Sequence, residues 1–86
     1  MTKQDKLKKR FLRRPAEVTF RDVEALMKSF GVKLRSQRGS HTVWRRDDGR
    51  KLTVPRKGGK KVVQPYINQI IEFLDLEGEN HEAKDG

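Results

Sequence analysis

The chain contains no cysteine, and this absence limits the folds and sites that it can form. Without cysteine there is neither a disulfide framework nor a zinc–thiolate site, so the fold must rest on packed secondary structure. No apolar stretch approaches the roughly 20 residues needed to cross a bilayer, and no hydrophobic signal segment follows the basic N-terminus. We therefore expect a soluble, cytoplasmic protein with no membrane partner.

Side chains suited to proton transfer near neutral pH are also scarce. The chain has two histidines, His41 and His81, and histidine is the residue whose ordinary pKa of about 6.5 lies nearest neutrality. His81 has acids nearby but no second histidine at ligand spacing, so we predict no metal site there and no other cofactor. No glycine-rich phosphate motif, serine triad or carboxylate pair is visible. If the chain is an enzyme, its chemistry takes place at His41.

Positive charge, by contrast, is abundant. The 86 residues carry a net charge of +9, although residues 77–86 hold four acids and one lysine. Removing this local charge of −3 leaves +12 on residues 1–76. Such an excess on a small domain favours a polyanion, and nucleic acid is the commonest one. A solvated surface that only keeps the protein soluble is the alternative interpretation.

The apolar pattern predicts an order of helix, three strands and helix. The strands cover residues 32–37, 40–46 and 51–54, and the helices cover residues 20–30 and 65–74. Thr19 is the predicted N-cap of the first helix, Gly31 its stop, and Asp47-Asp48-Gly49 a hairpin turn. Two helices on one face of a three-stranded antiparallel sheet give an α+β domain like the double-stranded-RNA-binding domains.

The remaining segments divide the chain into three parts. Residues 1–14 form a basic arm or a short helix, because they contain one apolar pair at i, i+4. Residues 15–18 are a spacer, and residues 56–61 (Arg-Lys-Gly-Gly-Lys-Lys) form a flexible basic loop. We expect the domain to cover residues 15–76 and residues 77–86 to form a disordered acidic tail.

Three segments, residues 19–32, 38–44 and 52–56, carry motifs of a known family. The first opens with Thr-Phe and ends in Ser-Phe-Gly-Val, the second reads Arg-Gly-Ser-His before Val43 and Trp44, and the third reads Leu-Thr-Val-Pro-Arg. In this order they resemble the HicA-type, or YcfA-like, toxin family, small RNA-cleaving partners of toxin–antitoxin pairs. The second motif is the most specific, and the resemblance runs over residues 19–74, about two-thirds of the chain.

Two positions depart from the common pattern of that family. Lys57 stands where many members have the histidine of a Pro-Arg-His triplet. Thr42 stands where many members have a second histidine directly after the first. All proton transfer near neutral pH would then fall on His41.

The resemblance implies a metal-independent endoribonuclease that cleaves mRNA and is held inactive by a cognate HicB-type antitoxin protein. Such cleavage needs a base for a ribose 2′-hydroxyl and cations for the charge of the phosphorane. His41 would be the general acid or base, Gly39 would shape the turn, and Ser40 would orient the imidazole or begin the strand. The candidates for holding RNA phosphates are basic residues, namely Lys33, Arg35, Arg38, Arg45, Arg46, Arg56, Lys57 and Lys60.

Several alternatives stay open. His41 could be a partly buried strand histidine that only bonds a backbone carbonyl. Alternation places it with Val43 and Arg45, opposite Trp44, without showing which face is the core or whether a bulge intervenes. Trp44 could stack on an RNA base or pack in the core. The whole chain could be an RNA-binding module that does not cut, or a domain whose basic face meets an acidic protein.

Overall fold

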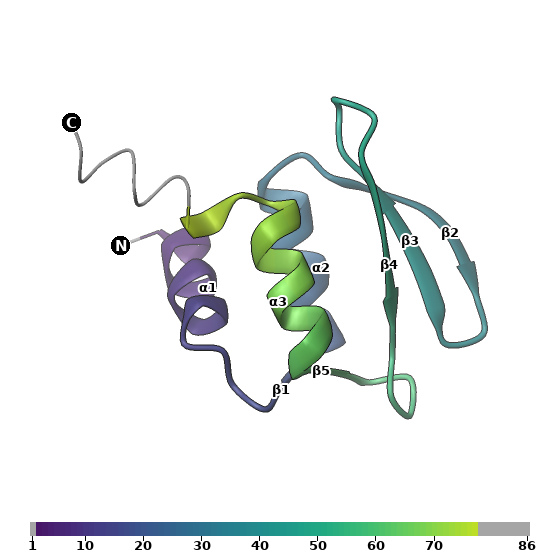
Figure 1. Ribbon diagram of the computed structural model, residues 1–86, viewed down its shortest axis with the longest axis horizontal. Coiled ribbons are helices and arrows are strands. Elements are labelled where there is room, and N and C mark those ends of the chain that lie inside the picture. Colours follow the sequence, from purple (N-terminus) through teal and green to yellow (C-terminus); the bar gives the residue numbers. More distant parts are fainter. Residues whose placement is uncertain (1, 78–86) are drawn as a thin grey trace.

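The computed structural model describes residues 2–77, which form three helices and five strands (Figure 1). The helices are α1 (Lys3–Leu12), α2 (Phe20–Ser29) and α3 (Gln64–Phe73), and the strands are β1 (Glu17–Thr19), β2 (Lys33–Arg38), β3 (His41–Arg45), β4 (Lys51–Pro55) and β5 (Lys61–Val63). Strands β2, β3 and β4 form one antiparallel sheet in that order, and β1 pairs with β5 in a second. The predicted α+β arrangement of helix, three strands and helix is confirmed.

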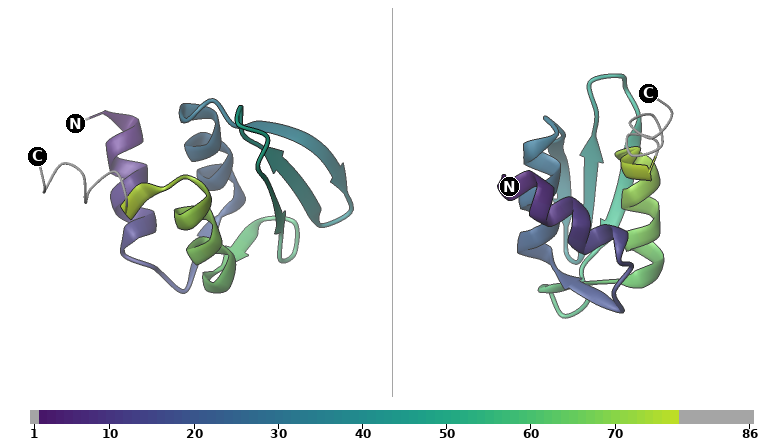
Figure 2. Two further views of the ribbon diagram at one scale, coloured as in Figure 1. Left: turned by 45° about the horizontal axis from the view of Figure 1, so that its top comes forward. Right: turned by 90° about the vertical axis from the view of Figure 1, so that its left-hand side faces the viewer.

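The helices lie on one side of the three-stranded sheet. In Figure 1, α2 and α3 lie next to β4, α1 lies beyond them, and β2 lies farthest from the helices. Figure 2 shows the same order from two further directions. Helix α3 contacts β4, and α1 contacts both other helices on their side away from the sheet. Within residues 2–77, no helix covers the opposite face of the sheet, and none has the length and apolar character needed to cross a membrane.

Alternation along β3 decides which face of the sheet is covered. Thr42 and Trp44 are 0% and 1% exposed, whereas His41 and Arg45 are exposed. The Trp44 ring packs against Phe20 of α2, with ring centroids 6.3 Å apart. The core therefore lies on the Thr42 side of β3, and Trp44 belongs to the core and offers no free ring for stacking on RNA.

The bulge lies in the neighbouring strand. The register between β2 and β3 shifts between Leu34 and Ser36, so β3 itself alternates without interruption. All six residues of β2 are exposed, including Leu34 at 40%, because this edge strand extends past the helical layer.

A buried hydroxyl links β3 to β4. Thr42 is the one fully buried polar side chain among residues 2–77. Its hydroxyl donates to the carbonyl oxygen of Val54 at 2.7 Å and accepts from Nε1 of Trp44 at 3.1 Å. The indole N–H of a buried tryptophan needs such a partner, so this pair of bonds fixes the orientation of the ring.

Local capping sets the starts of two helices. The Thr19 hydroxyl accepts from the backbone N–H of Asp22 at 3.1 Å, which confirms the predicted N-cap of α2. Helix α1 starts with a reciprocal capping box between Thr2 and Asp5. Its Phe11 is fully buried, so residues 3–12 form a helix that contributes to the core.

Two short strands are absent from the prediction. Residues 17 and 18 are expected to belong to a spacer and Lys61 to a flexible loop, but both expectations are wrong, because β1 pairs with β5. Val18 faces Val62 in this ladder, and both side chains are buried. Three residues are too few to show alternation, and the partners lie far apart in the sequence. The predicted acidic tail lies outside the described residues, except for its first residue, Glu77.

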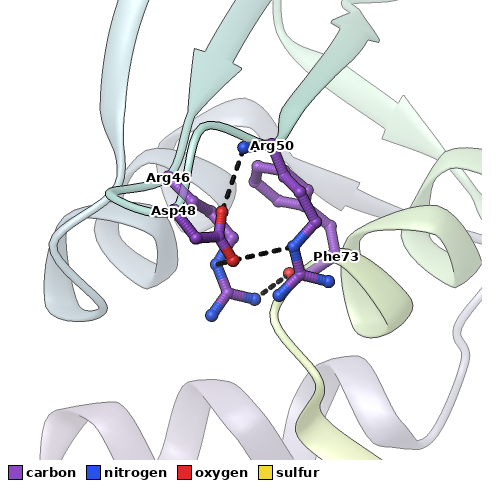
Figure 3. A network of polar contacts seen from close by, with 4 residues as sticks. All are labelled: Arg46, Asp48, Arg50 and Phe73. Atoms are coloured by element: carbon purple, nitrogen blue, oxygen red, sulfur yellow. Dashed lines mark hydrogen bonds and ion pairs between the residues drawn. The ribbon is translucent and has the colours of Figure 1, made fainter.

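A polar network holds the turn between β3 and β4 (Figure 3). The Asp48 carboxylate accepts from the backbone N–H of Arg50 at 3.0 Å and from Nε of Arg50 at 2.9 Å, and it lies 3.8 Å from Nε of Arg46. Arg46 donates to the carbonyl oxygen of Phe73 and lies 6.0 Å from the centre of its ring. The network therefore ties the turn to the end of α3. The pKa of Asp48 lies below its ordinary value, chiefly because its carboxylate accepts a hydrogen bond from the backbone N–H of Arg50. The Arg50 side chain and the charge of Arg46 also lower this pKa.

We expect Thr42→Val to destabilise the fold by about 1–3 kcal/mol, because it leaves the buried Nε1–H of Trp44 without a partner. Urea unfolding measures the free energy of unfolding. Thr53→Val is the matched control, since Thr53 is exposed on the neighbouring strand, and it should change stability by less than about 0.5 kcal/mol. Equal effects of the two substitutions would show that the buried hydroxyl does not matter.

Asp48→Asn should destabilise the fold at neutral pH but not in acid. The folded-state pKa of Asp48 lies below its ordinary value of 3.8, so its stabilising contribution is present above that pH and disappears as the pH falls through the lower, folded-state pKa. Urea unfolding of both proteins, from neutral pH to well below 3.8, measures the difference. Asp47→Asn removes the same charge without these contacts and is the control. A difference that does not shrink in acid contradicts the prediction.

Candidate functional site

The face of the three-stranded sheet turned away from the helices, called the open face below, carries His41 at one end. Paired residues of antiparallel neighbours share a face, so the register places Arg38, His41 and Pro55 in one row across the sheet. Arg38 and His41 are both exposed. No group within residues 2–77 makes a hydrogen bond or an ion pair with the His41 imidazole. The alternative of a partly buried histidine satisfied by a carbonyl is therefore wrong.

The other end of the open face carries a row of cations. Lys33, Arg45 and Lys51 pair across the three strands, and all three are exposed; they are called the cation row below. The sequences of β2, β3 and β4 contain no acid. Arg35 adjoins the row. A shallow hollow of about 180 Å³ beside the turn is lined by four cations and one acid, namely Lys33, Arg35, Arg45, Arg46 and Asp47. The open face is therefore positive at the end opposite His41.

Lys51 is missing from the predicted set of phosphate contacts. It lies opposite Arg45 because the hairpin is symmetric about Asp48, with the N–H of Arg46 bonded to the carbonyl of Arg50 at 2.9 Å. The signal that would have revealed it is the Asp-Asp-Gly turn itself, since a turn fixes the register of the strands that it joins.

The turn before His41 is held by Arg56. Gly39 has φ of +56°, a conformation that glycine adopts without strain. The backbone N–H of Arg56 donates to the carbonyl of Ser40 at 2.7 Å, and its Nη2 donates to the carbonyl of Gly39 at 3.1 Å. The guanidinium also lies 4.8 Å from the centre of the Phe20 ring. Gly39, Ser40, His41 and Arg56, all predicted site residues, are thus brought together at one end of the sheet.

The remaining predicted phosphate contacts separate into two groups. Lys57 and Lys60 are exposed in the turn between β4 and β5, just after the strand end that pairs with His41. Arg46 lies at the other end of the sheet, where it contacts Asp48 and Phe73. Its guanidinium is therefore engaged within the fold, while the two lysines lie at the end of the sheet that carries His41.

Other parts of the described structure offer no rival site for proton transfer. Within residues 2–77, no three His, Cys, Asp or Glu side chains gather where a metal ion could bind. A hollow of about 510 Å³ lies between α1 and α2, lined by residues such as Leu7, Ala25 and Lys28, and it contains no histidine. The group suited to acid–base chemistry near neutral pH thus lies on the open face.

Comparison with known proteins places the chain in a family. A search of curated proteins and a search of solved structures each gave no significant match. The family model described as the HicA toxin of bacterial toxin-antitoxin matches residues 20–76, which include α2, the whole three-stranded sheet and α3. The match covers more than half of the 86 residues. The chain therefore belongs to the HicA toxin family of bacterial toxin–antitoxin systems.

Proposed function

We propose that this toxin is a metal-independent endoribonuclease that cleaves mRNA, with His41 as its general acid or base. The observation that carries the proposal is the exposure of His41 on an open sheet face whose strands contain cations and no acid. An imidazole that no neighbour engages can accept a proton from a substrate. A surface with this excess of cations attracts the phosphate backbone that carries the scissile bond.

In the proposed reaction, His41 accepts the proton of a ribose 2′-hydroxyl while the 2′-oxygen attacks the adjacent phosphorus. The bond from phosphorus to the 5′-oxygen of the next nucleotide breaks, and that oxygen takes a proton from the imidazolium or from water. The products are a 2′,3′-cyclic phosphate and a 5′-hydroxyl end. Arg38, in the same row as His41, is the nearest cation in the sheet register for the charge that develops on the phosphorane.

The cation row supports RNA as the ligand on energetic grounds. Like charges directly opposite each other on neighbouring strands destabilise a sheet, and here three cations lie in one row with no acid on these strands. A phosphate backbone laid across the row would relieve this repulsion. Arg45 lies four residues from His41 along β3, roughly 13 Å at the rise of a strand. We infer that RNA runs along β3. The cation row then holds one part of the RNA backbone, and His41 acts on a bond roughly 13 Å away.

The partner protein follows from the family. Members of toxin–antitoxin systems are paired with an antitoxin, and we propose that a cognate HicB-type antitoxin covers His41 and the open face. An antitoxin bound there would exclude RNA from both the histidine and the cation row, so one contact surface would suffice for inhibition.

His41→Ala should reduce cleavage of a long labelled RNA at least about 100-fold, because it removes the acid–base group, while RNA binding stays near the wild-type level. Reactions in EDTA, read for both fragments and gel shift, measure the two properties together. The wild-type fragments should end in a 5′-hydroxyl, which a polynucleotide kinase can label.

His81→Ala is the matched control, since it removes the second histidine of the chain, and it should cleave like the wild type. RNA binding by all three proteins without cleavage would reject the nuclease and favour the non-catalytic RNA-binding module. Cleavage by His41→Ala at the wild-type rate would reject His41 as the catalytic residue.

Arg45→Gln and Lys51→Gln should each weaken RNA binding and lower its dependence on salt by about one released counterion. We expect each also to leave folding stability unchanged or slightly raised at low salt, because like charges are removed from the row. Gel shifts over a salt series in the His41→Ala background measure binding without cleavage. Lys28→Gln removes an exposed cation from the helical side and should have little effect. Equal losses for all three variants would contradict a specific RNA path over the cation row.

A further inference from the structure

We infer that Arg56 is a positioning residue, which holds the turn before His41 against helix α2, and that it does not serve as a phosphate ligand. The inference concerns the site of the proposed nuclease and rests on that function for its catalytic consequence. The contacts that define it lie within the protein and can be tested without cleavage.

Arg56 joins three parts of the fold that are distant in the sequence. It follows the last residue of β4, its Nη2 donates to the carbonyl of Gly39 at 3.1 Å, and its guanidinium lies 4.8 Å from the centre of the Phe20 ring. Phe20 is the first residue of α2 and is 6% exposed, so it offers a rigid support. The side chain therefore connects the Gly39 turn to the helical layer.

The Gly39 turn needs such a connection. Gly39 and Ser40 are exposed, and the turn joins β3 to β2, the strand that extends past the helices. Exposed turns with few buried contacts are the segments that open most easily. Apart from the Arg56 side chain, a backbone bond of 2.7 Å from Arg56 to Ser40 ties this turn to β4. Since His41 follows directly, the order of the turn sets the position of the imidazole.

Arg56 lines a hollow of about 480 Å³ with Arg21 and Lys60, but most of its guanidinium is engaged within the protein. Its Nε is buried and has no hydrogen-bond partner among the described residues, so RNA cannot reach this donor. One face of the group is occupied by the Phe20 ring, and Nη2 is engaged with Gly39. A lysine cannot reproduce this arrangement, because it lacks a planar group that stacks and donates at the same time.

Two substitutions separate the positioning role from a phosphate contact. Arg56→Lys keeps the positive charge but loses the planar group. Arg56→Met keeps an apolar stem over Phe20 but loses both the charge and the planar group. If Arg56 positions the turn, kcat should fall by about tenfold or more in both variants. In Arg56→Lys, KM and the salt dependence of RNA binding should change little. A phosphate contact predicts near wild-type kcat in Arg56→Lys and weaker binding in Arg56→Met. Lys28→Met is the control, since it removes an exposed cation on the helical side and should change neither kcat nor RNA binding.

Amide hydrogen exchange supplies a readout that does not depend on catalysis. The backbone amide of residue 56 donates to Ser40, and we expect it to exchange faster in both variants than in the wild type. The amide of Arg50, which donates to Asp48 at the other end of the sheet, is the internal control and should not change. Urea unfolding shows whether the variants stay folded.

The outcomes are distinct. Unchanged exchange at residue 56 in both variants overturns the inference, and so does wild-type kcat in Arg56→Lys. If the wild type cuts no RNA, the proposed function fails, yet faster local exchange in both variants still supports Arg56 as the residue that holds the turn.

Discussion

The position of the candidate site on the sheet depends on the burial of one face of β3. Trp44 packs against Phe20 and receives its hydrogen-bond partner from Thr42, so these two alternate residues are fixed toward the helices. Because side chains alternate along a strand, His41 and Arg45 must then point to the other face. A slip of one residue would bury His41 and expose the indole, at the cost of the core. The packing of Trp44 in the core thus determines on which face of the sheet the His41 imidazole is exposed to solvent.

The open face shows how a small domain can carry a surface that does not favour its own folding. Three cations lie in one row and His41 lies at the far end, with no acid on the strands to balance them. Elsewhere the chain does pair its charges, as in the ion pairs of Arg10 with Asp22 and of Lys61 with Glu17. The difference is consistent with a face reserved for an anionic ligand, and an antitoxin bound there would compete with RNA for the same cations.

The family match begins at Phe20, but the core does not. Phe11 of α1 and Val18 of β1 precede the matched region, and both are buried among the helices and the small second sheet. Helix α1 covers the side of α2 and α3 that faces away from the main sheet. The preceding segment therefore completes the packing of the matched domain in this chain.

Signals between neighbours in the sequence determined the order of helices and strands, the Thr19 cap, the Asp-Asp-Gly turn, the excess of positive charge and the choice of His41 as the candidate base. Periodicity, caps and turns act over a few residues, so they can be read without a structure. Only the tertiary structure decided that His41 is exposed, that β1 pairs with β5, and that Arg46 and Arg56 are engaged within the fold. These features depend on contacts between residues far apart in the chain, such as the contact of Arg56 with Phe20. No local pattern in the sequence indicates which cation makes a contact of this kind.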